Sequence, residues 1–237
     1  MSARSYPGPP ETPNADRRRI RAILNRLQKH FGSRLALPRR IDPMDELILT
    51  VLSQHTSDLN AERAFKELRD WLPTWDAVVA SPTSALADII RSGGLANQKA
   101  PRIQAILREI HAREGAYSLA SLRDLSDVDA RAYLTSIPGV GPKTAAVVLS
   151  FALGRDALPV DTHVHRVTRR LGIIPAKASA ERADALLHEL VPDGLRTPLH
   201  VAFIRLGREI CKAPVPRCRE CPLRDLCPTA PRFLSKV

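Results

Sequence analysis

Apolar residues recur every three or four positions along most of the 237-residue chain, with polar residues between them. This spacing places the apolar side chains on one face of an α-helix. No stretch shows the sustained alternation of apolar and polar residues that is typical of a β-strand. We therefore predict an all-α chain. The apolar faces of the predicted helices lie at residues 20–31, 47–52, 103–110, 130–137, 145–152, 164–171, 186–191 and 197–210.

Two of these helices flank a turn with the sequence Ile-Pro-Gly-Val-Gly-Pro-Lys at residues 137–143. Gly139 and Gly141 allow positive φ and let another backbone approach closely. Pro142 suits the first turn of a helix, where its missing N–H would have no intrahelical acceptor. The stretch therefore predicts a helix–hairpin–helix whose loop, with Val140 between the two glycines, binds phosphate through backbone N–H groups.

Lys143 follows this loop in the first turn of the second helix, although cations are favoured at the opposite end of a helix. One interpretation is a lysine that reaches solvent or touches a phosphate. Another is an amine nucleophile whose neutral form is favoured by the helix N-terminus and by partial burial. The position of Lys143 alone leaves both interpretations open.

Composition narrows the class of partner. The formal net charge of +11 and the pI near 10.2 indicate a polyanionic partner. No run approaches the roughly 18 apolar residues of a membrane-spanning helix, and no signal peptide is visible. Aromatic residues make up only 4% of the chain, which argues against a broad base-stacking platform. We expect a soluble, intracellular nucleic-acid binder with no membrane partner.

All four cysteines lie close to the C-terminus with the spacing C-x6-C-x2-C-x5-C, at Cys211, Cys218, Cys221 and Cys227. Disulfides are rare in the reducing compartment expected for a basic protein without a signal peptide. Four thiolates so close in sequence therefore predict a metal site. The spacing leaves zinc and an iron–sulfur cluster as alternatives, although zinc ligands more often come in two close pairs.

Two segments carry a resemblance to a known family. Ile-Pro-Gly-Val-Gly-Pro-Lys-Thr-Ala at residues 137–145, followed by Val-Asp-Thr-His-Val-His-Arg-Val at residues 160–167, resembles endonuclease III within the helix–hairpin–helix DNA glycosylases. The resemblance runs from about Asp42 to Pro228. It implies that Lys143 attacks the sugar and that Asp161 assists it. The cysteine spacing is similar to that of the family's 4Fe–4S loop in every interval. This similarity implies a 4Fe–4S cluster as the cofactor, and it implies that the loop presents Lys212 and Arg217 to phosphate.

The resemblance also implies residues that open the base stack. The position similar to the family's gap-filling glutamine holds His55, with Gln54 one residue before it, so either can fill the gap or be a plain loop residue. Leu95 matches a wedge residue, in keeping with apolar wedges at kinked base steps, but it can equally fold into the core. Thr162 and His163 flank Asp161, and we expect them to line the base pocket unless the histidine is structural.

The implied function is a bifunctional DNA glycosylase and AP lyase of base excision repair. It would remove oxidised or ring-saturated pyrimidines from damaged double-stranded DNA, which requires flipping the nucleotide, and cleave the strand 3′ to the abasic site by β-elimination. We expect a monomer in the cytoplasm, nucleoid-associated in a bacterium. The alternatives are a monofunctional mismatch glycosylase of the same superfamily and a non-catalytic iron–sulfur DNA-binding protein. The presence of Lys143 argues against the first, and Lys143 together with Asp161 argues against the second.

For the architecture we expect two helical lobes. A six-helix domain with the hairpin would span residues 36–154. Residues 16–35 and 155–237 would form the iron–sulfur cluster domain, and residues 1–15 would be disordered. Two short helices are expected between Trp71 and Arg91, capped around Pro73-Thr74 and Pro82-Thr83, and Ser57 or Asp58 is expected to cap the helix that follows it.

Overall fold

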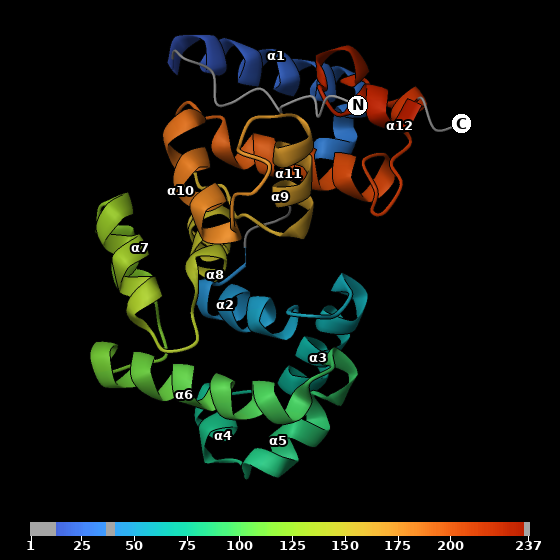
Figure 1. The fold of residues 1–237 in the computed structure, drawn as a ribbon. Helices are drawn as coiled ribbons and strands as arrows, with labels where there is room; N and C mark the ends of the chain where they lie inside the picture. The colour runs from blue at the N-terminus through green and yellow to red at the C-terminus, as the bar shows by residue number, and fades with distance from the viewer. Residues whose placement is uncertain (1–12, 37–40, 235–237) are drawn as a thin grey trace. The chain divides into compact units, whose positions relative to one another are not determined.

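The computed structural model describes residues 13–36 and 41–234, and within these ranges the chain is helical with no strand (Figure 1). The all-α prediction is therefore confirmed. The chain divides into two compact units, Met1–Pro38 with Asp156–Val237, and Arg39–Arg155. No described helix is both long and apolar enough to cross a membrane.

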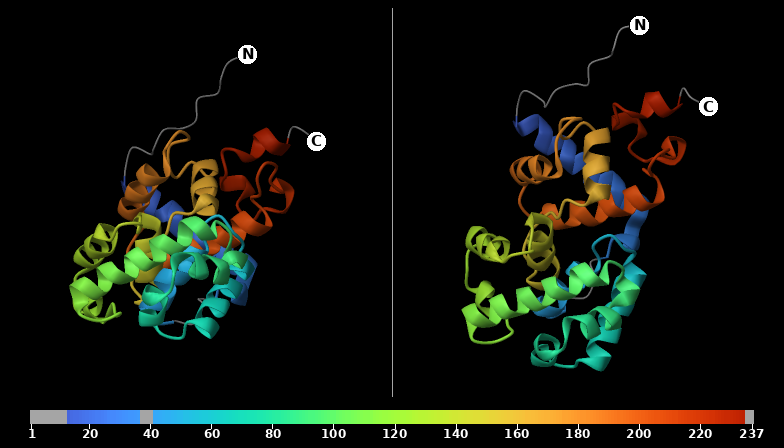
Figure 2. Two further views of the ribbon diagram at one scale, coloured as in Figure 1. Left: turned by 90° about the horizontal axis from the view of Figure 1, so that it is seen from below. Right: turned by 60° about the horizontal axis from the view of Figure 1, so that its bottom comes forward.

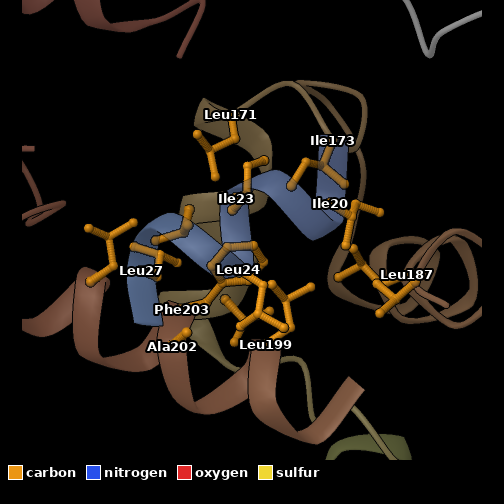
Figure 3. Close-up of a cluster of buried hydrophobic side chains, with 14 of the residues drawn as sticks. Ile20, Ile23, Leu24, Leu27, Leu171, Ile173, Leu187, Leu199, Ala202 and Phe203 are labelled. Atoms are coloured by element: carbon orange, nitrogen blue, oxygen red, sulfur yellow. The ribbon is translucent and has the colours of Figure 1, made fainter. Parts of the chain in front are cut away.

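The unit that contains both ends of the chain is built on a core shared by helices distant in sequence. Ile23, Leu24 and Leu27 of α1 are buried with Leu199 and Phe203 of α11, as Figure 3 shows. Helix α9 packs along α11. The helical elements of this unit are α1 (Pro13–Phe31), η1 (Gly32–Leu35), α9 (Thr162–Arg170), α10 (Ala180–Leu190), α11 (Arg196–Glu209), η5 (Cys218–Glu220), η6 (Arg224–Leu226) and α12 (Ala230–Leu234).

The start of α1 lies within the segment predicted to be disordered. The helix begins at Pro13. Residues 1–12 of that predicted segment lie outside the described residues, so its prediction stays untested there.

The second unit is organised around α2, which contacts α3, α6 and α8 (Figure 2). Most side chains of α2 are buried, because it lies among other helices rather than on the surface. The elements of this unit are α2 (Pro43–Leu52), α3 (Asp58–Trp71), α4 (Trp75–Ala80), α5 (Thr83–Ile89), η2 (Arg91–Gly93), α6 (Ala96–Glu114), η3 (Ala120–Arg123), α7 (Asp127–Ser136), α8 (Pro142–Val147) and η4 (Val148–Ala152).

The two short helices expected between Trp71 and Arg91 are present as α4 and α5, and with them the described residues of this unit contain seven α-helices rather than six. The predicted cap of α4 is present, since the Thr74 hydroxyl accepts a hydrogen bond from the Ala77 N–H at 3.2 Å. Ser57 likewise caps α3 by accepting from the Asn60 N–H at 3.2 Å. At α5 the N-cap is Pro82, without a side-chain hydrogen bond.

The helix after the hairpin differs from its prediction. It was expected to remain α-helical to Ala152, but α8 ends at Val147 and the chain continues as a π-helical turn, η4. The Leu153 N–H donates to the Val148 carbonyl at 3.0 Å, five residues back. Apolar spacing over two turns does not distinguish a 3.6-residue turn from a slightly wider one, so the sequence pattern could not reveal it.

Candidate functional site

The hairpin between α7 and α8 forms a tight turn in which Gly139 has φ of +91°. Ile137 and Val140 are buried, and they anchor the turn in the core of its own unit. The Val140 N–H donates to the Ile137 carbonyl at 3.0 Å. That N–H is therefore committed within the turn, and the unpaired donors at this point are the N–H groups of the first turn of α8, which have no intrahelical acceptors.

Lys143 is the second residue of α8, after the N-cap Gly141 and the first helical residue Pro142. Its side chain is half-buried. The helix N-terminus carries partial positive charge, so this end of α8 favours a bound anion beside the lysine. The sequence-predicted position of Lys143, directly after the hairpin and within the first helical turn, matches the structure.

Asp161 is the N-cap of α9, in the other unit of the chain. Its Oδ1 accepts a hydrogen bond from the Val164 N–H at 2.7 Å, which fixes the orientation of the carboxylate. The cap occupies one of the two carboxylate oxygens. Because Lys143 and Asp161 belong to different compact units, the structure defines the surroundings of each residue separately.

The two residues after Asp161 have different surroundings. Thr162 is exposed at the start of α9. His163 is half-buried against α11, where a Cβ added at Gly207 would lie 2.9 Å from its Cβ. The ring Nδ1 lies 3.1 Å from Nη2 of Arg166. These contacts favour the structural interpretation of His163, and the base-pocket role of both residues stays a prediction.

The corner between α2 and α3 separates the two gap-filling candidates. The side-chain carbonyl of Gln54 accepts a hydrogen bond from Nη1 of Arg102 at 2.8 Å, and Gln54 is half-buried. His55 is exposed and has φ of +55°. The structure thus leaves His55, rather than Gln54, unengaged on the surface of the corner.

Leu95 is an exposed apolar residue at the N-cap of α6. Its side chain is 46% exposed and its backbone is left-handed, with φ of +51°. The alternative in which Leu95 folds into the core is therefore excluded. An exposed leucine at a helix start is compatible with a wedge, and the wedge role of Leu95 stays a prediction.

The four cysteines converge in the unit that contains α9 and α11. All four are free thiols, and all four line one cavity together with apolar residues such as Leu206 and Phe233. Burial raises the pKa of the Cys221 thiol to about 11, and it raises the pKa of Cys218 and Cys227 as well. Among the described residues, no set of three or more His, Cys, Asp or Glu side chains is arranged to hold a single metal ion.

Two arginines one turn apart on α9 hold the first segment of this cysteine loop. Arg166 donates through Nε to the Cys211 carbonyl at 2.9 Å. Arg170 donates to the carbonyls of Lys212 at 2.7 Å and Pro214 at 3.2 Å, and its Nη1 lies 3.4 Å from the Cys211 sulfur. The loop conformation around Cys211 thus depends on guanidinium contacts from α9.

Helix α1 supports the last segment of the cysteine loop in the same way. Arg19 donates to the carbonyls of Leu171 and Leu226, and Arg26 pairs with Asp225 at 2.5 Å. These two arginines of α1 therefore have a structural role. On the loop itself, Lys212 is exposed, and Arg217 is exposed with a loose contact to Glu220 at 3.8 Å.

Comparison with known proteins agrees with this geometry. Residues 48–193 match the HhH-GPD superfamily of base excision DNA repair proteins. The chain is 38% identical over 189 residues to endonuclease III of Thermotoga maritima, which covers 80% of this chain and 84% of the relative. The chain belongs to the endonuclease III family. It is also 34% identical over 208 residues to endonuclease III of Escherichia coli strain K12, covering 86% of this chain and 92% of the relative.

A solved structure of a trapped endonuclease III–DNA covalent intermediate matches with a TM-score of 0.80 and 34% identity, over 92% of this chain and 98% of that one. Membership of the endonuclease III family confirms the predicted family, the helical fold and the class of enzyme, a DNA glycosylase with AP lyase activity. It also supports DNA as the partner. The roles of individual residues stay predictions.

Sequence reasoning missed four cations that organise these loops, namely Lys99, Arg102, Arg166 and Arg170. The sequence held a signal for Lys99, because it lies four residues before Ile103 and therefore on the apolar face of α6. In the structure its side chain is 2% exposed. The two arginines of α9 are spaced i, i+4, which shows that they share a face but not what they contact.

Proposed function

We propose that the protein removes oxidised or ring-saturated pyrimidines from double-stranded DNA and then cleaves the strand by β-elimination. The observation that carries the proposal is the place of Lys143, in the first turn of α8 directly after a glycine hairpin held to its unit by buried Val140. The first-turn N–H groups of α8 favour a phosphate beside the lysine. That anchor would hold the DNA strand while the amine meets the sugar.

In the first step the Lys143 nitrogen forms a bond to C1′ of the flipped nucleotide as the bond from C1′ to the base breaks. The base leaves with the bonding electron pair and takes up a proton. Asp161 stabilises the positive charge that develops on the sugar and helps to accept the proton released by the amine. Its cap to Val164, at 2.7 Å, holds the carboxylate in one orientation without a rearrangement during the reaction.

In the second step the sugar ring opens and the lysine–C1′ bond becomes a protonated Schiff base. Loss of a proton from C2′ then expels the 3′ phosphate, which breaks the strand. Hydrolysis of the Schiff base returns the free Lys143 amine. A relative without an amine at this position would release the base with water only, so Lys143 favours the bifunctional reaction.

We assign the four cysteines to a 4Fe–4S cluster. Four free thiols that line one cavity with apolar walls suit such a group. Cys211, Cys218, Cys221 and Cys227 would hold the cluster, which would stabilise the loop and supply no chemistry to base release. The chain's own contribution is a folded loop that carries Lys212 and Arg217 toward phosphate.

An excision assay on a panel of duplexes, each with one damaged base, tests the proposed function. We expect release of oxidised or ring-saturated pyrimidines and a strand break that leaves the β-elimination product, by a monomer in solution. Purified protein should be yellow-brown and contain iron. Release of the base without strand cleavage would contradict the bifunctional assignment, and a colourless protein with stoichiometric zinc after anaerobic handling would contradict the cluster.

A further inference from the structure

A buried lysine joins two loops of the unit that contains the hairpin. Lys99, in the first turns of α6, is 2% exposed. Its Nζ donates to the Leu52 carbonyl at 2.6 Å and to the Gly93 carbonyl at 2.8 Å. Leu52 ends α2 at the start of the corner that carries His55, and Gly93 ends η2 two residues before Leu95. One ammonium thus holds the backbone of both loops.

The contacts of Lys99 explain how a lysine is tolerated in the core. A buried charge is costly unless it is hydrogen-bonded, and burial lowers the pKa of Lys99. The Leu52 carbonyl is one of those left without an intrahelical donor at the end of α2, where a cation is favoured. Lys99 therefore satisfies a helix terminus that would otherwise be unpaired.

Both loops held by Lys99 carry a strained residue. Among the described residues, His55 and Leu95 are the two non-glycine residues with positive φ, at +55° and +51°. Such conformations persist only where the surroundings determine them strongly. The backbone of Lys99 also constrains Leu95, because the Lys99 N–H donates to the Leu95 carbonyl at 3.0 Å. Both strained side chains are exposed.

Arg102, one turn further along α6, joins the corner to the hairpin. It donates to the Gln54 side chain at 2.8 Å. Its stem lies over Gly139, where an added Cβ would be 3.0 Å from Arg102 Cγ. One face of α6 therefore ties together the corner at residues 53–57, the loop at residues 91–95 and the hairpin.

We propose that Lys99 and Arg102 are positioning residues for base extrusion, which fix His55 and Leu95 so that the two side chains enter the duplex together at a set distance from the hairpin. This inference rests on the proposed function, since it concerns how double-stranded DNA is opened. Neither residue touches the reacting atoms. Displacement of either loop by about 1 Å should slow base excision by about 10²-fold when correct placement limits the reaction.

The first test measures base unstacking without chemistry. In a Lys143→Gln background, the duplex carries the fluorescent base 2-aminopurine beside the lesion, and its fluorescence rises when the stack opens. We expect the rise to be lost in Lys99→Met, which keeps the unbranched stem but removes the ammonium, and retained in Lys66→Met, an exposed lysine of α3 that pairs with Asp70. An unchanged rise in Lys99→Met would overturn the proposal.

The second test is a double-mutant cycle on the excision rate with active enzyme. Leu95→Ala and Lys99→Met should each slow excision by about 10²-fold, and the double variant should be little slower than either, because Lys99 acts through Leu95. If the double variant is slower by the product of the two single effects, the proposal is overturned. If Lys99→Met does not fold, the same cycle is run with Arg102→Met and His55→Ala, since both residues are exposed, and the same two outcomes decide it.

The outcomes also separate this inference from the proposed function. Unmodified protein that excises no damaged base contradicts the proposed function itself. Unmodified protein that excises normally, with Lys99→Met and Arg102→Met as fast as it, contradicts the positioning role alone.

Discussion

Asp161 combines a structural and a chemical role in one side chain. Its Oδ1 caps α9 through the Val164 N–H, while the negative charge is what the proposed reaction requires. Asparagine caps helices about as well as aspartate, whereas alanine costs about 1 kcal/mol. A change to asparagine therefore removes the charge and keeps the cap, so the two roles can be measured apart.

Asp161→Asn should slow base release by about 10²-fold or more, the usual scale for a positioned acid–base or electrostatic group. Thermal unfolding should change little because the cap remains. DNA binding should survive or tighten, since one negative charge is lost. Asp42→Asn, which makes the same change at the cap of α2, is the control and should leave the rate unaltered. A rate for Asp161→Asn close to that of the unmodified protein would remove Asp161 from the mechanism.

Single residues also show where sequence reasoning stopped. Motif position was enough to select Leu95, but whether its side chain faced solvent or the core depended on the left-handed backbone at φ of +51°. At the corner, His55 and Gln54 could not be ranked until Arg102, 48 positions away, was seen to engage the glutamine. Contacts between such distant positions leave no trace in local spacing.

At the scale of elements, the cysteine loop depends on helices far from it in sequence. Arg170 of α9 contacts the backbone of Lys212 and Pro214 and lies 5.1 Å from the Phe233 ring centre through a cation–π contact. Its neighbour Arg169 is exposed. The two arginines therefore form a matched pair for testing which contacts retain the loop.

Arg170→Met should release iron faster when a chelator is added, as followed by loss of visible absorbance. A charge-assisted hydrogen bond contributes about 1.5–3 kcal/mol, which corresponds to a release rate about tenfold higher or more. Arg169→Met should release iron at the rate of the unmodified protein. Equal release from the two variants would show that the α9 contact does not stabilise the loop.

Helices were the elements that the sequence predicted best, because each buries one apolar face and that face recurs with the helical period. The predicted helices at residues 20–31, 130–137 and 164–171 correspond to α1, α7 and α9. Caps at Ser57 and Thr74 were predictable for the same local reason. The π-helical turn η4 was not, since it depends on how its side chains fit the core of the unit.

At the scale of the whole molecule, the net charge of +11 should govern DNA affinity. Each cation that contacts a phosphate releases counterions, so the affinity should fall steeply with salt. Lys212→Ala and Arg217→Ala should each lower affinity about equally for all DNA sequences and flatten the salt slope by about one unit. Fluorescence anisotropy over a salt series measures this, with Lys66→Ala, at an exposed lysine of α3 that pairs with Asp70, as a control that should not flatten the slope. Altered base preference in either variant would contradict a phosphate role.

The sequence predicted the fold class and the family of the protein more fully than it predicted the geometry of the candidate site. Helical periodicity, charge and two motifs were sufficient for the fold class and the family. The surroundings of Lys143 and Asp161, which lie in different compact units, arise from packing within each unit. Lys99, an apparent surface cation by composition, proved to be buried between two loops.

The most direct measurement of the proposed chemistry is borohydride trapping of the protein on a damaged duplex, followed by peptide mapping of the adduct. Reduction of the Schiff base should leave DNA covalently attached to the peptide that contains Lys143. Lys143→Gln should abolish trapping and strand cleavage while binding remains, and Lys66→Gln, an exposed lysine that pairs with Asp70, should trap normally. Efficient trapping by Lys143→Gln through another lysine would show that the nucleophile lies elsewhere.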